Sequence, residues 1–419
     1  MLGTATVPTA PRTAEPSRWS IALAGAVSLA VAMGIGRFAF TPLLPMMLHD
    51  GVIDLHGASW LASANYLGYL AGALLCTFQP WIWARVPGLP GIVATKLVRG
   101  GLVATGLLTL GMALPWPWAW GLLRFAAGVA SAVVFVYVSG WCLATLARMN
   151  HAALGGAIYT GPGAGIVISG VFASGMVQWG WHAQTGWIIF GVLAFVLSAL
   201  IWRTFRAAGP AAPSAAAAGA AAMPAHGAGE IGVLAFAYGI AGFGYIVTAT
   251  FLPVIARQAL PGSPWLDMFW PVFGLGVMLG ALLATRVRVT LDMRLLLAGC
   301  YAVQALGIAI GVWSPSLAGF AVGSLMLGVP FTAITFFAMQ EIRRLKSPHV
   351  VASFMGLMTA LYGIGQIVGP PMVAWILRGA SSTGAGFTLS LEVAAGALVV
   401  GAAMYVAMAR LWPRVAPTV

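Results

Sequence analysis

The stretch WSIALAGAVSLAVAMGIGRFAFTPLLPMML, residues 19–48, decides the fold class of this chain. Its only charged side chain is Arg37, and the other residues are apolar, small or hydroxyl-bearing. About 20 apolar residues are enough for a helix to cross the hydrocarbon core of a bilayer. The run has no cleavage-like end after its apolar part, so we interpret it as a retained first transmembrane span rather than a secretory signal.

The composition extends this interpretation to the whole chain. Of the 419 residues, 61% are hydrophobic and 7% are charged, and the mean hydropathy is +0.96. Soluble domains carry roughly 25% charged residues, so a water-soluble protein is excluded. Segments of alternating hydrophobicity, which mark outer-membrane barrels, do not occur. The sequence therefore predicts an all-α membrane protein embedded in the lipid bilayer.

Apolar runs between Gly, Pro, Trp and Arg breakers predict twelve transmembrane helices in two six-helix bundles. The spans lie at residues 19–48, 58–82, 92–113, 117–146, 153–178, 185–202, 231–256, 267–285, 293–313, 316–342, 350–377 and 387–410. We expect a tail at 1–18, an N-terminal bundle at 19–202, a linker rich in Ala, Pro and Gly at 203–230, a C-terminal bundle at 231–410 and a second tail at 411–419.

The positions of the basic residues predict the orientation. With the N-terminus inside, 16 of the 20 Lys and Arg residues fall on cytoplasmic ends and loops, as the positive-inside rule requires. We expect a multi-pass protein of the bacterial inner membrane, with both termini cytoplasmic. The net charge of +12 is then explained by topology, and no nucleic-acid partner is expected.

The two halves are related by an internal repeat. Shifted by 208 residues, Gly34, Gly36 and Pro45 align with Gly242, Gly244 and Pro253, while Arg37 aligns with Tyr245. A shift of 200 aligns later glycines, among them Gly128 with Gly328 and Gly165 with Gly365. Two parallel halves of this kind are typical of alternating-access transporters, whose binding site lies at mid-membrane between them.

Several motifs resemble the major facilitator superfamily over residues 19–411. The segment Arg124-Phe-Ala-Ala-Gly128 is similar to the family's R-x-x-x-G motif, and Gly161-Pro162-Gly163-Ala164-Gly165 to its antiporter-type motif. The run GIGRFAFTPLLP resembles the YbfB/YjiJ-like branch. In one departure, Cys76 stands where the family usually has an aspartate after the second span. The resemblance implies the major facilitator fold and transport by alternating access.

Arg37 is the first candidate for a binding residue. It lies near mid-membrane, where a charged side chain costs about 2.5 to 3.5 kcal/mol on insertion scales and should therefore face a cavity or a partner. Gly34, Arg37 and Thr41 share one helical face. Arg37 either binds an anionic group of the solute or is held by backbone carbonyls or a loop carboxylate.

Arg124 has two open interpretations as well. It either contacts the solute or organises the N-terminal bundle and supports coupling, because small residues such as Gly121 and Gly128 on its face suit close helix packing. Carboxylates of the first half are confined to the tail and the first outer loop, at Glu15, Asp50 and Asp54. Two embedded arginines without a buried carboxylate favour an anionic solute over a cationic drug.

Polar stripes on other spans are further candidates. Asn65 and Tyr69 share one face of the second span, Tyr245 occupies the position equivalent to Arg37, and Thr359, Tyr362 and Gln366 share one face of the eleventh span. Each set either lines the cavity or connects helices by hydrogen bonds. The motif residues Gly161, Pro162, Gly165 and Gly128 are interpreted as helix-packing positions.

Glu392 is interpreted as the only acidic residue plainly within a span and is the candidate for coupling to a proton, with a position in the headgroup region as the alternative. The six histidines show no metal-ligand spacing, the three cysteines lie in apolar runs, and no hydrolase or nucleotide-binding motif stands in a suitable context. We therefore expect no enzyme, no cofactor and no metal.

These observations predict a monomeric secondary transporter that moves a small, carboxylate-type organic anion by alternating access. The alternative within transport is an efflux pump for amphipathic or drug-like compounds, which the 17 Trp and 20 Phe residues favour. The alternative from another class is a transport-dead membrane receptor or scaffold, which would be expected to carry long soluble extensions.

Overall fold

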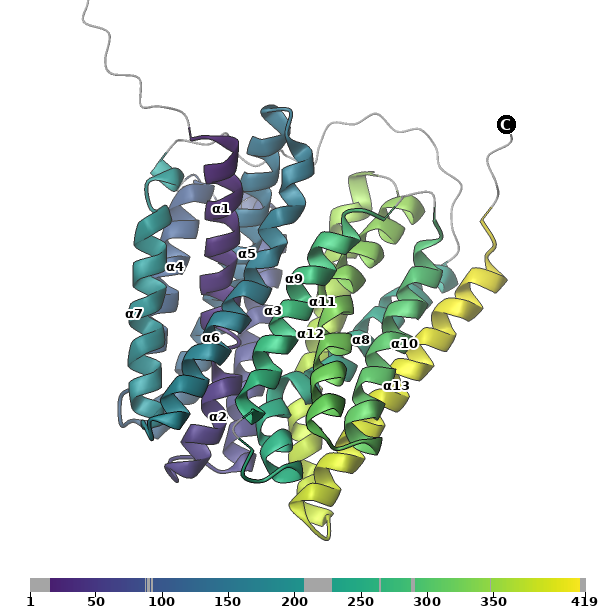
Figure 1. Cartoon of the computed structure of the whole chain (residues 1–419). Coiled ribbons are helices and arrows are strands. Elements are labelled where there is room, and N and C mark those ends of the chain that lie inside the picture. Colours follow the sequence, from purple (N-terminus) through teal and green to yellow (C-terminus); the bar gives the residue numbers. More distant parts are fainter. Residues whose placement is uncertain are drawn as a thin grey trace, which may run out of the picture.

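The structure is a computed structural model of the whole chain, and it describes residues 16–86, 88, 91, 93–206, 228–263, 265–287, 291–346 and 348–414. The described part consists of helices arranged as two bundles that stand side by side (Figure 1). In the described part, twelve helical units correspond one to one with the twelve predicted spans, and the predicted fold class is confirmed.

The N-terminal bundle contains six of these units. The first is composed of α1 (Arg18–Leu29), the π-helical turn η1 (Ala30–Ile35) and α2 (Phe40–His49). The others are α3 (Leu55–Arg85), α4 (Ala94–Gly111), α5 (Pro117–Arg148), the pair η2 (Ala152–Thr160) and α6 (Gly161–Gln178), and α7 (Ala183–Ile201), which is followed by η3 (Thr204–Arg206).

The C-terminal bundle contains the other six units. They are α8 (Ala228–Ala259), the pair η4 (Leu266–Met268) and α9 (Phe269–Ala284), α10 (Met293–Trp313), α11 (Leu317–Leu345), α12 (Pro348–Gly379) and α13 (Thr383–Leu411). Of the predicted linker, residues 207–227 lie outside the described residues, as do residues 1–15 and 415–419 of the two tails. Glu230, which the prediction assigned to the linker, belongs to the first turn of α8.

Eleven of the helical units in the described part are long and apolar enough to cross a membrane. The remaining unit is α4, which has 18 residues and carries Lys96 and Arg99 in its first turns. Both cations lie at the start of the helix, and the twelve uncharged residues that follow make about 18 Å of helix. Several helices begin at a side-chain cap, for example α3 at Asp54, whose carboxylate accepts a hydrogen bond from the Gly57 N–H.

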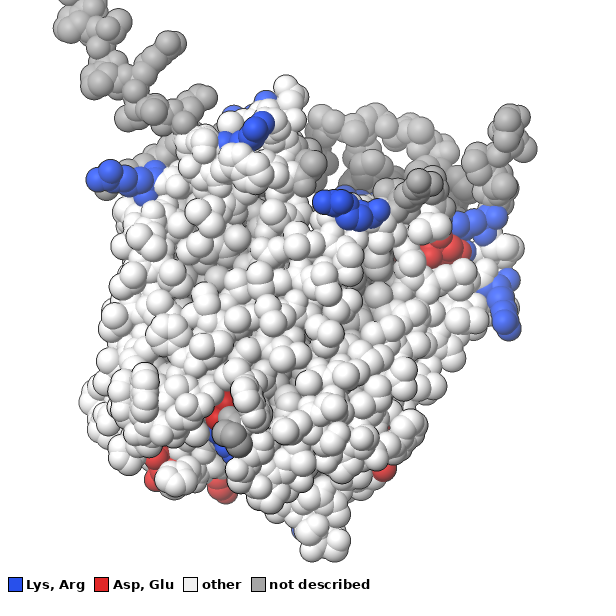
Figure 2. Space-filling model, in the orientation of Figure 1, with Lys and Arg blue, Asp and Glu red and all other residues white. Residues whose placement is uncertain are grey.

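Charge separates the two ends of the molecule. We call the end at which α1 begins and α13 ends the basic end, and the other the opposite end. Lys and Arg gather at the basic end, whereas the broad middle zone of the face shown is almost free of charge (Figure 2). A zone of this kind is what a lipid-facing surface requires, since charged side chains are costly in the bilayer core.

Candidate functional site

The first membrane-crossing unit is interrupted at Arg37. The Gly36 N–H bonds to the Val31 carbonyl and the Phe38 N–H bonds to the Met33 carbonyl, both five residues back, as in a π-helix. Residues 36–39 then form turns before α2 begins at Phe40. The Thr41 N–H bonds to the Phe38 carbonyl instead of the Arg37 carbonyl, at 3.2 Å. The interruption leaves main-chain carbonyls near Arg37 without their usual helical partners.

Side chains of α5 satisfy these carbonyls. Arg124 donates through Nη1 to the Gly36 carbonyl at 3.2 Å and through Nη2 to the Arg37 carbonyl at 3.0 Å. Ser131 donates to the Ala32 carbonyl at 2.6 Å. Irregular backbone inside a membrane persists only where other protein groups satisfy it. Of the two interpretations left open for Arg124, these contacts favour support of the Arg37 turn over direct contact with a solute.

The side chain of Arg37 reaches across to the C-terminal bundle. Its Nη2 donates to Oε1 of Gln366 on α12 at 2.5 Å, and Nε2 of Gln366 donates to the hydroxyl of Tyr245 on α8. All three residues are buried, with exposed fractions of 4% or less. The chain Arg37, Gln366 and Tyr245 therefore connects the two bundles at the level of the interrupted helix.

Aromatic rings surround the guanidinium of Arg37. Its Cζ lies 4.2 Å from the ring centroid of Tyr69, 5.2 Å from that of Tyr66 and 5.3 Å from that of Phe38. These contacts stabilise a cation without neutralising it. Further rings continue this surface on the C-terminal side: Tyr245 stacks on Tyr362 at 5.8 Å and meets Phe331 edge to face at 4.9 Å.

Among the described residues no carboxylate contacts Arg37 or Arg124. Asp50 and Asp54 lie in the loop before α3, and Asp267 pairs with Arg257 at 2.5 Å. Glu230, Asp292 and Glu341 belong to a cluster at the basic end, and Glu392 is exposed on α13. The site therefore carries uncompensated positive charge in a mainly apolar and aromatic environment.

The other predicted site residues lie at different distances from this centre. Tyr69, Tyr245, Tyr362 and Gln366 belong to it. Asn65 lies beside it and donates to the Arg124 carbonyl at 2.9 Å, which ties α3 to α5. Thr359 donates to the Met355 carbonyl of its own helix at 2.8 Å, and Glu392 is exposed on α13.

The glycine motifs allow close approach of helices. A Cβ added at Gly165 would lie 2.5 Å from the Ala30 carbonyl oxygen, and one at Gly161 would lie 2.1 Å from that of Ala26, so both glycines face the first helical unit. At Gly128 an added Cβ would lie 2.1 Å from the Asn65 carbonyl oxygen on α3. Pro162 occupies the first turn of α6, where a missing N–H costs no helical hydrogen bond.

Hydrogen bonds between the bundles lie on one side of the site. Within the described residues, side chains cross between the bundles in five pairs, which we call the seam: Arg37 with Gln366, Thr41 with Ala249, Ser63 with Ile367, Tyr66 with Thr250, and His56 with Arg378. All of them lie between the level of Arg37 and the opposite end, as the directions of α2, α3, α8 and α12 require. The bundles are thus joined by hydrogen bonds at the opposite end.

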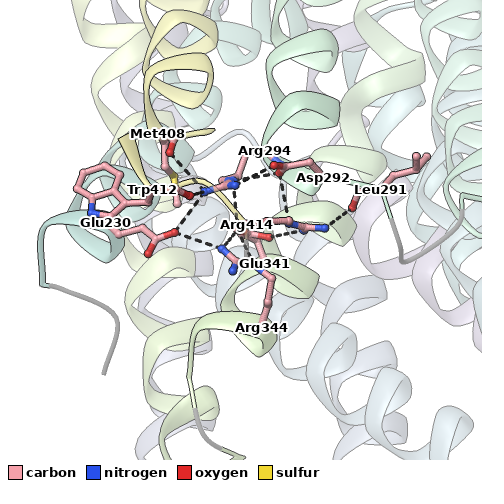
Figure 3. A network of polar contacts seen from close by, with 9 residues as sticks. All are labelled: Glu230, Leu291, Asp292, Arg294, Glu341, Arg344, Met408, Trp412 and Arg414. Carbon is pink, nitrogen blue, oxygen red and sulfur yellow. Dashed lines mark hydrogen bonds and ion pairs between the residues drawn. The ribbon is translucent and has the colours of Figure 1, made fainter. Parts of the chain in front are cut away.

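A buried ionic cluster at the basic end was missed by the sequence analysis. Arg294 contacts Asp292 at 2.8 Å and Glu230 at 3.4 Å, and Glu341 contacts Arg344 at 2.6 Å and Arg414 at 3.2 Å (Figure 3). The interpretation of Glu392 as the only acidic residue plainly within a span was wrong, because Glu341 lies fully buried in α11. The chain positions of these residues, at helix ends, suggested solvated charges and gave no signal of burial.

The cluster connects four segments of the C-terminal bundle. Glu230 comes from the start of α8, Asp292 and Arg294 from the start of α10, Glu341 from the end of α11, and Arg414 from the segment after α13. Arg294 also donates to the Trp412 carbonyl at 2.6 Å. Burial opposes ionisation of Asp292, but hydrogen bonds from Arg294 and the charges of Arg294 and Arg414 outweigh it, so the pKa of Asp292 lies below its ordinary value.

Comparisons with solved structures agree with this architecture. A mutant of the nucleoside transporter NupG superposes with a TM-score of 0.70 at 14% identity, covering 93% of this chain and 99% of that one. A bacterial homologue of the human lysosomal transporter Spinster, in an inward-facing and unoccupied conformation, gives a TM-score of 0.65 at 15% identity, covering 97% of this chain and 100% of the other. These similarities show the fold alone.

Family membership follows from the sequence itself. No curated protein matches the chain. A family model does: the model described as "Uncharacterised MFS-type transporter YbfB" matches residues 29–406, which is most of the chain. Its members are transporters of the major facilitator type rather than enzymes, in agreement with the two helical bundles. The chain therefore belongs to the YbfB family of MFS-type membrane transporters.

Proposed function

We propose that this transporter moves a small organic anion of the carboxylate type and that Arg37 binds its anionic group. One observation carries the proposal: a buried guanidinium at mid-membrane, between the two bundles, has no carboxylate partner among the described residues. An anion about 4 Å away gains roughly 4 kcal/mol at an effective dielectric near 20, before desolvation. A gain of that size is enough to select an anion over a neutral compound of similar shape.

The aromatic rings around Arg37 suggest the chemical character of the uncharged part of the solute. Tyr69 and Tyr362 are half-buried, while Tyr245 and Tyr66 are buried and carry hydroxyl groups that bond to Gln366 and Thr250. Aromatic walls with a few polar groups suit a ligand that combines an apolar or ring-shaped body with one charged end. We therefore infer a monocarboxylate with an apolar body rather than a small polyanion.

Orientation and driving force complete the proposal. The basic end faces the cytoplasm of a bacterial inner membrane, in line with the positive-inside rule, so the seam closes the external side. A gradient of the solute or of a coupling ion drives transport. Glu392 is exposed on α13, and we assign it no part in binding the anion.

Uptake into proteoliposomes tests the proposal. We would compare benzoate, succinate, a sulfonate and the neutral nucleoside uridine for wild type, Arg37→Gln and the charge-retaining control Arg37→Lys. Wild type should transport benzoate best, and Arg37→Gln should lower its uptake by at least about tenfold, because a lost ionic contact of about 1.4 kcal/mol already has that effect. Arg37→Lys should retain part of the uptake, since the charge stays.

Two outcomes would contradict the proposal. Transport of uridine without transport of any anion would exclude the assigned solute class. Anion uptake that is unchanged in Arg37→Gln would exclude Arg37 as the contact.

A further inference from the structure

We propose that the amide of Gln366 occupies the place of the solute's anionic oxygen, so that binding of the anion displaces Gln366 and opens the seam at the level of Arg37. This inference rests on the proposed function in naming the ligand. The structural part, that Gln366 holds the two bundles together through Arg37, is testable without any solute.

The hydrogen-bonding state of Arg37 is the first argument. A guanidinium has five N–H donors, yet within the described part of the chain only Nη2 of Arg37 makes a hydrogen bond, and its Nε–H is buried without an acceptor. Nε–H and the outer Nη2–H point from the same edge of the guanidinium plane, which is the edge that a carboxylate binds with both oxygens. Gln366 thus bonds to one of the two nitrogens of that edge, and the other is without an acceptor.

The second argument concerns strength. The Gln366 amide offers one neutral oxygen, whereas a carboxylate offers two charged ones and satisfies the Nε–H as well. An anion can therefore replace the amide, while a neutral solute competes with it on nearly equal terms. The occupied guanidinium edge discriminates against solutes that lack a negative charge.

The third argument links displacement to the seam. Gln366 is buried on α12, and the next residue, Ile367, accepts a hydrogen bond from Ser63 of α3 at 3.0 Å. Gln366 also bonds to Tyr245 of α8, so it joins two helices of the C-terminal bundle to the first helical unit. Release of its Oε1 removes the seam contact closest to the basic end and leaves the remaining ones at the opposite end. Binding thereby loosens the contact between the bundles at the level of the site.

The first experiment uses the full-length protein in detergent without solute. We would measure thermal unfolding of wild type, Gln366→Glu and Gln366→Leu, together with Arg37→Gln and the exchange Arg37→Gln/Gln366→Arg. Gln366→Glu should unfold at the highest temperature, since Arg37 then holds a charged partner, and Gln366→Leu should unfold below wild type. The exchange should recover most of the loss seen in Arg37→Gln, because it restores a guanidinium–amide pair. A melting temperature of Gln366→Glu at or below that of Gln366→Leu, with no recovery in the exchange, would overturn the bridging role.

The second experiment measures benzoate affinity by calorimetry. Gln366→Glu should bind benzoate at least about tenfold more weakly than wild type, because the anion must displace a carboxylate. Gln366→Leu should bind as tightly or more tightly, because nothing competes for the guanidinium edge. Ser390→Ala is the matched control: it removes a buried hydroxyl that donates to the Gly386 carbonyl of its own helix, away from the seam, and should leave the affinity within about twofold.

The outcomes separate the two proposals. Weaker binding in Gln366→Leu than in wild type would make Gln366 a direct contact of the solute and overturn its role as a placeholder, as would equal affinities in wild type and Gln366→Glu. If wild type binds no carboxylate at all, the proposed function fails and the placeholder role fails with it, while the unfolding experiment still decides whether Gln366 bridges the bundles.

Discussion

At the residue scale, Arg37 and Arg124 differ in what their side chains contact. The sequence left two interpretations open for each: contact with the solute, or a structural role. Arg37 points its guanidinium between the bundles, and Arg124 uses both Nη groups on the main chain beneath it. The absence of nearby carboxylates could be predicted from the few acidic residues of the first half. The Gln366 partner could not, because it lies 329 residues away along the chain and only the fold brings it close.

Substitution of Arg124 should damage the site through Arg37. Arg124→Gln removes donors to the Gly36 and Arg37 carbonyls, and a hydrogen bond from a charged donor contributes about 1.5 to 3 kcal/mol. We expect a clear loss of thermal stability and of anion uptake together. Arg124→Lys keeps the charge but cannot donate to two carbonyls from a planar fork, so it should rescue only part of the loss. Normal uptake in Arg124→Gln would contradict the supporting role.

A second prediction at this scale concerns Arg294. Removing one partner of a buried ion pair costs about 3 to 5 kcal/mol, because the remaining charges stay buried without compensation. Arg294→Met should therefore lower the unfolding free energy by an amount of that order, measured by denaturant or thermal unfolding in detergent. The control Arg343→Met alters an exposed arginine of the same end and should change stability little. Equal effects of both variants would argue against the cluster as a stabilising element.

At the element scale, the interruption of the first helical unit is the main difference from the sequence prediction. Residues 19–48 were predicted as one transmembrane span. The helix is interrupted at residues 30–39, where its carbonyls find donors on α5. In the second half the position equivalent to Arg124 is Ser324, and α8 runs continuously from Ala228 to Ala259. The arginine and the irregular backbone therefore occur together in one half only.

Close packing beneath the interruption can be tested at Gly165. An alanine there would place its Cβ 2.5 Å from the Ala30 carbonyl oxygen and 2.6 Å from the Gly34 Cα, which forces the two helices apart. Overpacking of this kind costs about 1 to 3 kcal/mol. Gly140→Ala on α5 is the control, because its Cβ would meet open space. A melting temperature that falls only in Gly165→Ala is the expected result; equal stabilities would show that the helix pair adapts without cost.

At the scale of the whole molecule, the twelve spans, the duplication and the basic end were all predictable, because hydropathy and charge act locally along the chain. The ionic cluster was not, since helix ends that lie far apart in sequence come together only after the C-terminal bundle has packed. The seam could not be predicted either. Its residues lie on helix surfaces that also contact helices of their own bundle, so the sequence does not show which of them bond to the other bundle.

The acid stability of the C-terminal bundle follows from this cluster. The pKa of Asp292 is lowered in the folded protein, so its stabilising contribution is complete above the ordinary aspartate value of about 4 and declines as the pH falls below it. Thermal unfolding measured from pH 7 to pH 3 should therefore show a loss of stability that begins near pH 4. Asp292→Asn should be less stable than wild type at pH 7 and should lose less on acidification. An identical acid profile in both proteins would exclude Asp292 as a contributor.

The one-sided seam also has a consequence for the balance between conformations. Five hydrogen bonds at about 0.5 to 1.5 kcal/mol each amount to roughly 3 to 7 kcal/mol. A two-state equilibrium moves from 1:99 to 99:1 with about 5.5 kcal/mol. The free energy of the seam is of this size, so the bundles can separate there reversibly. Loss of the Tyr66 hydroxyl, in Tyr66→Phe, would shift the conformational populations by up to about tenfold, while the ring that faces the Arg37 guanidinium stays in place. The seam thus contributes to the preference of the transporter for one conformation through five contacts, three of them neutral, and each can be changed by a single substitution.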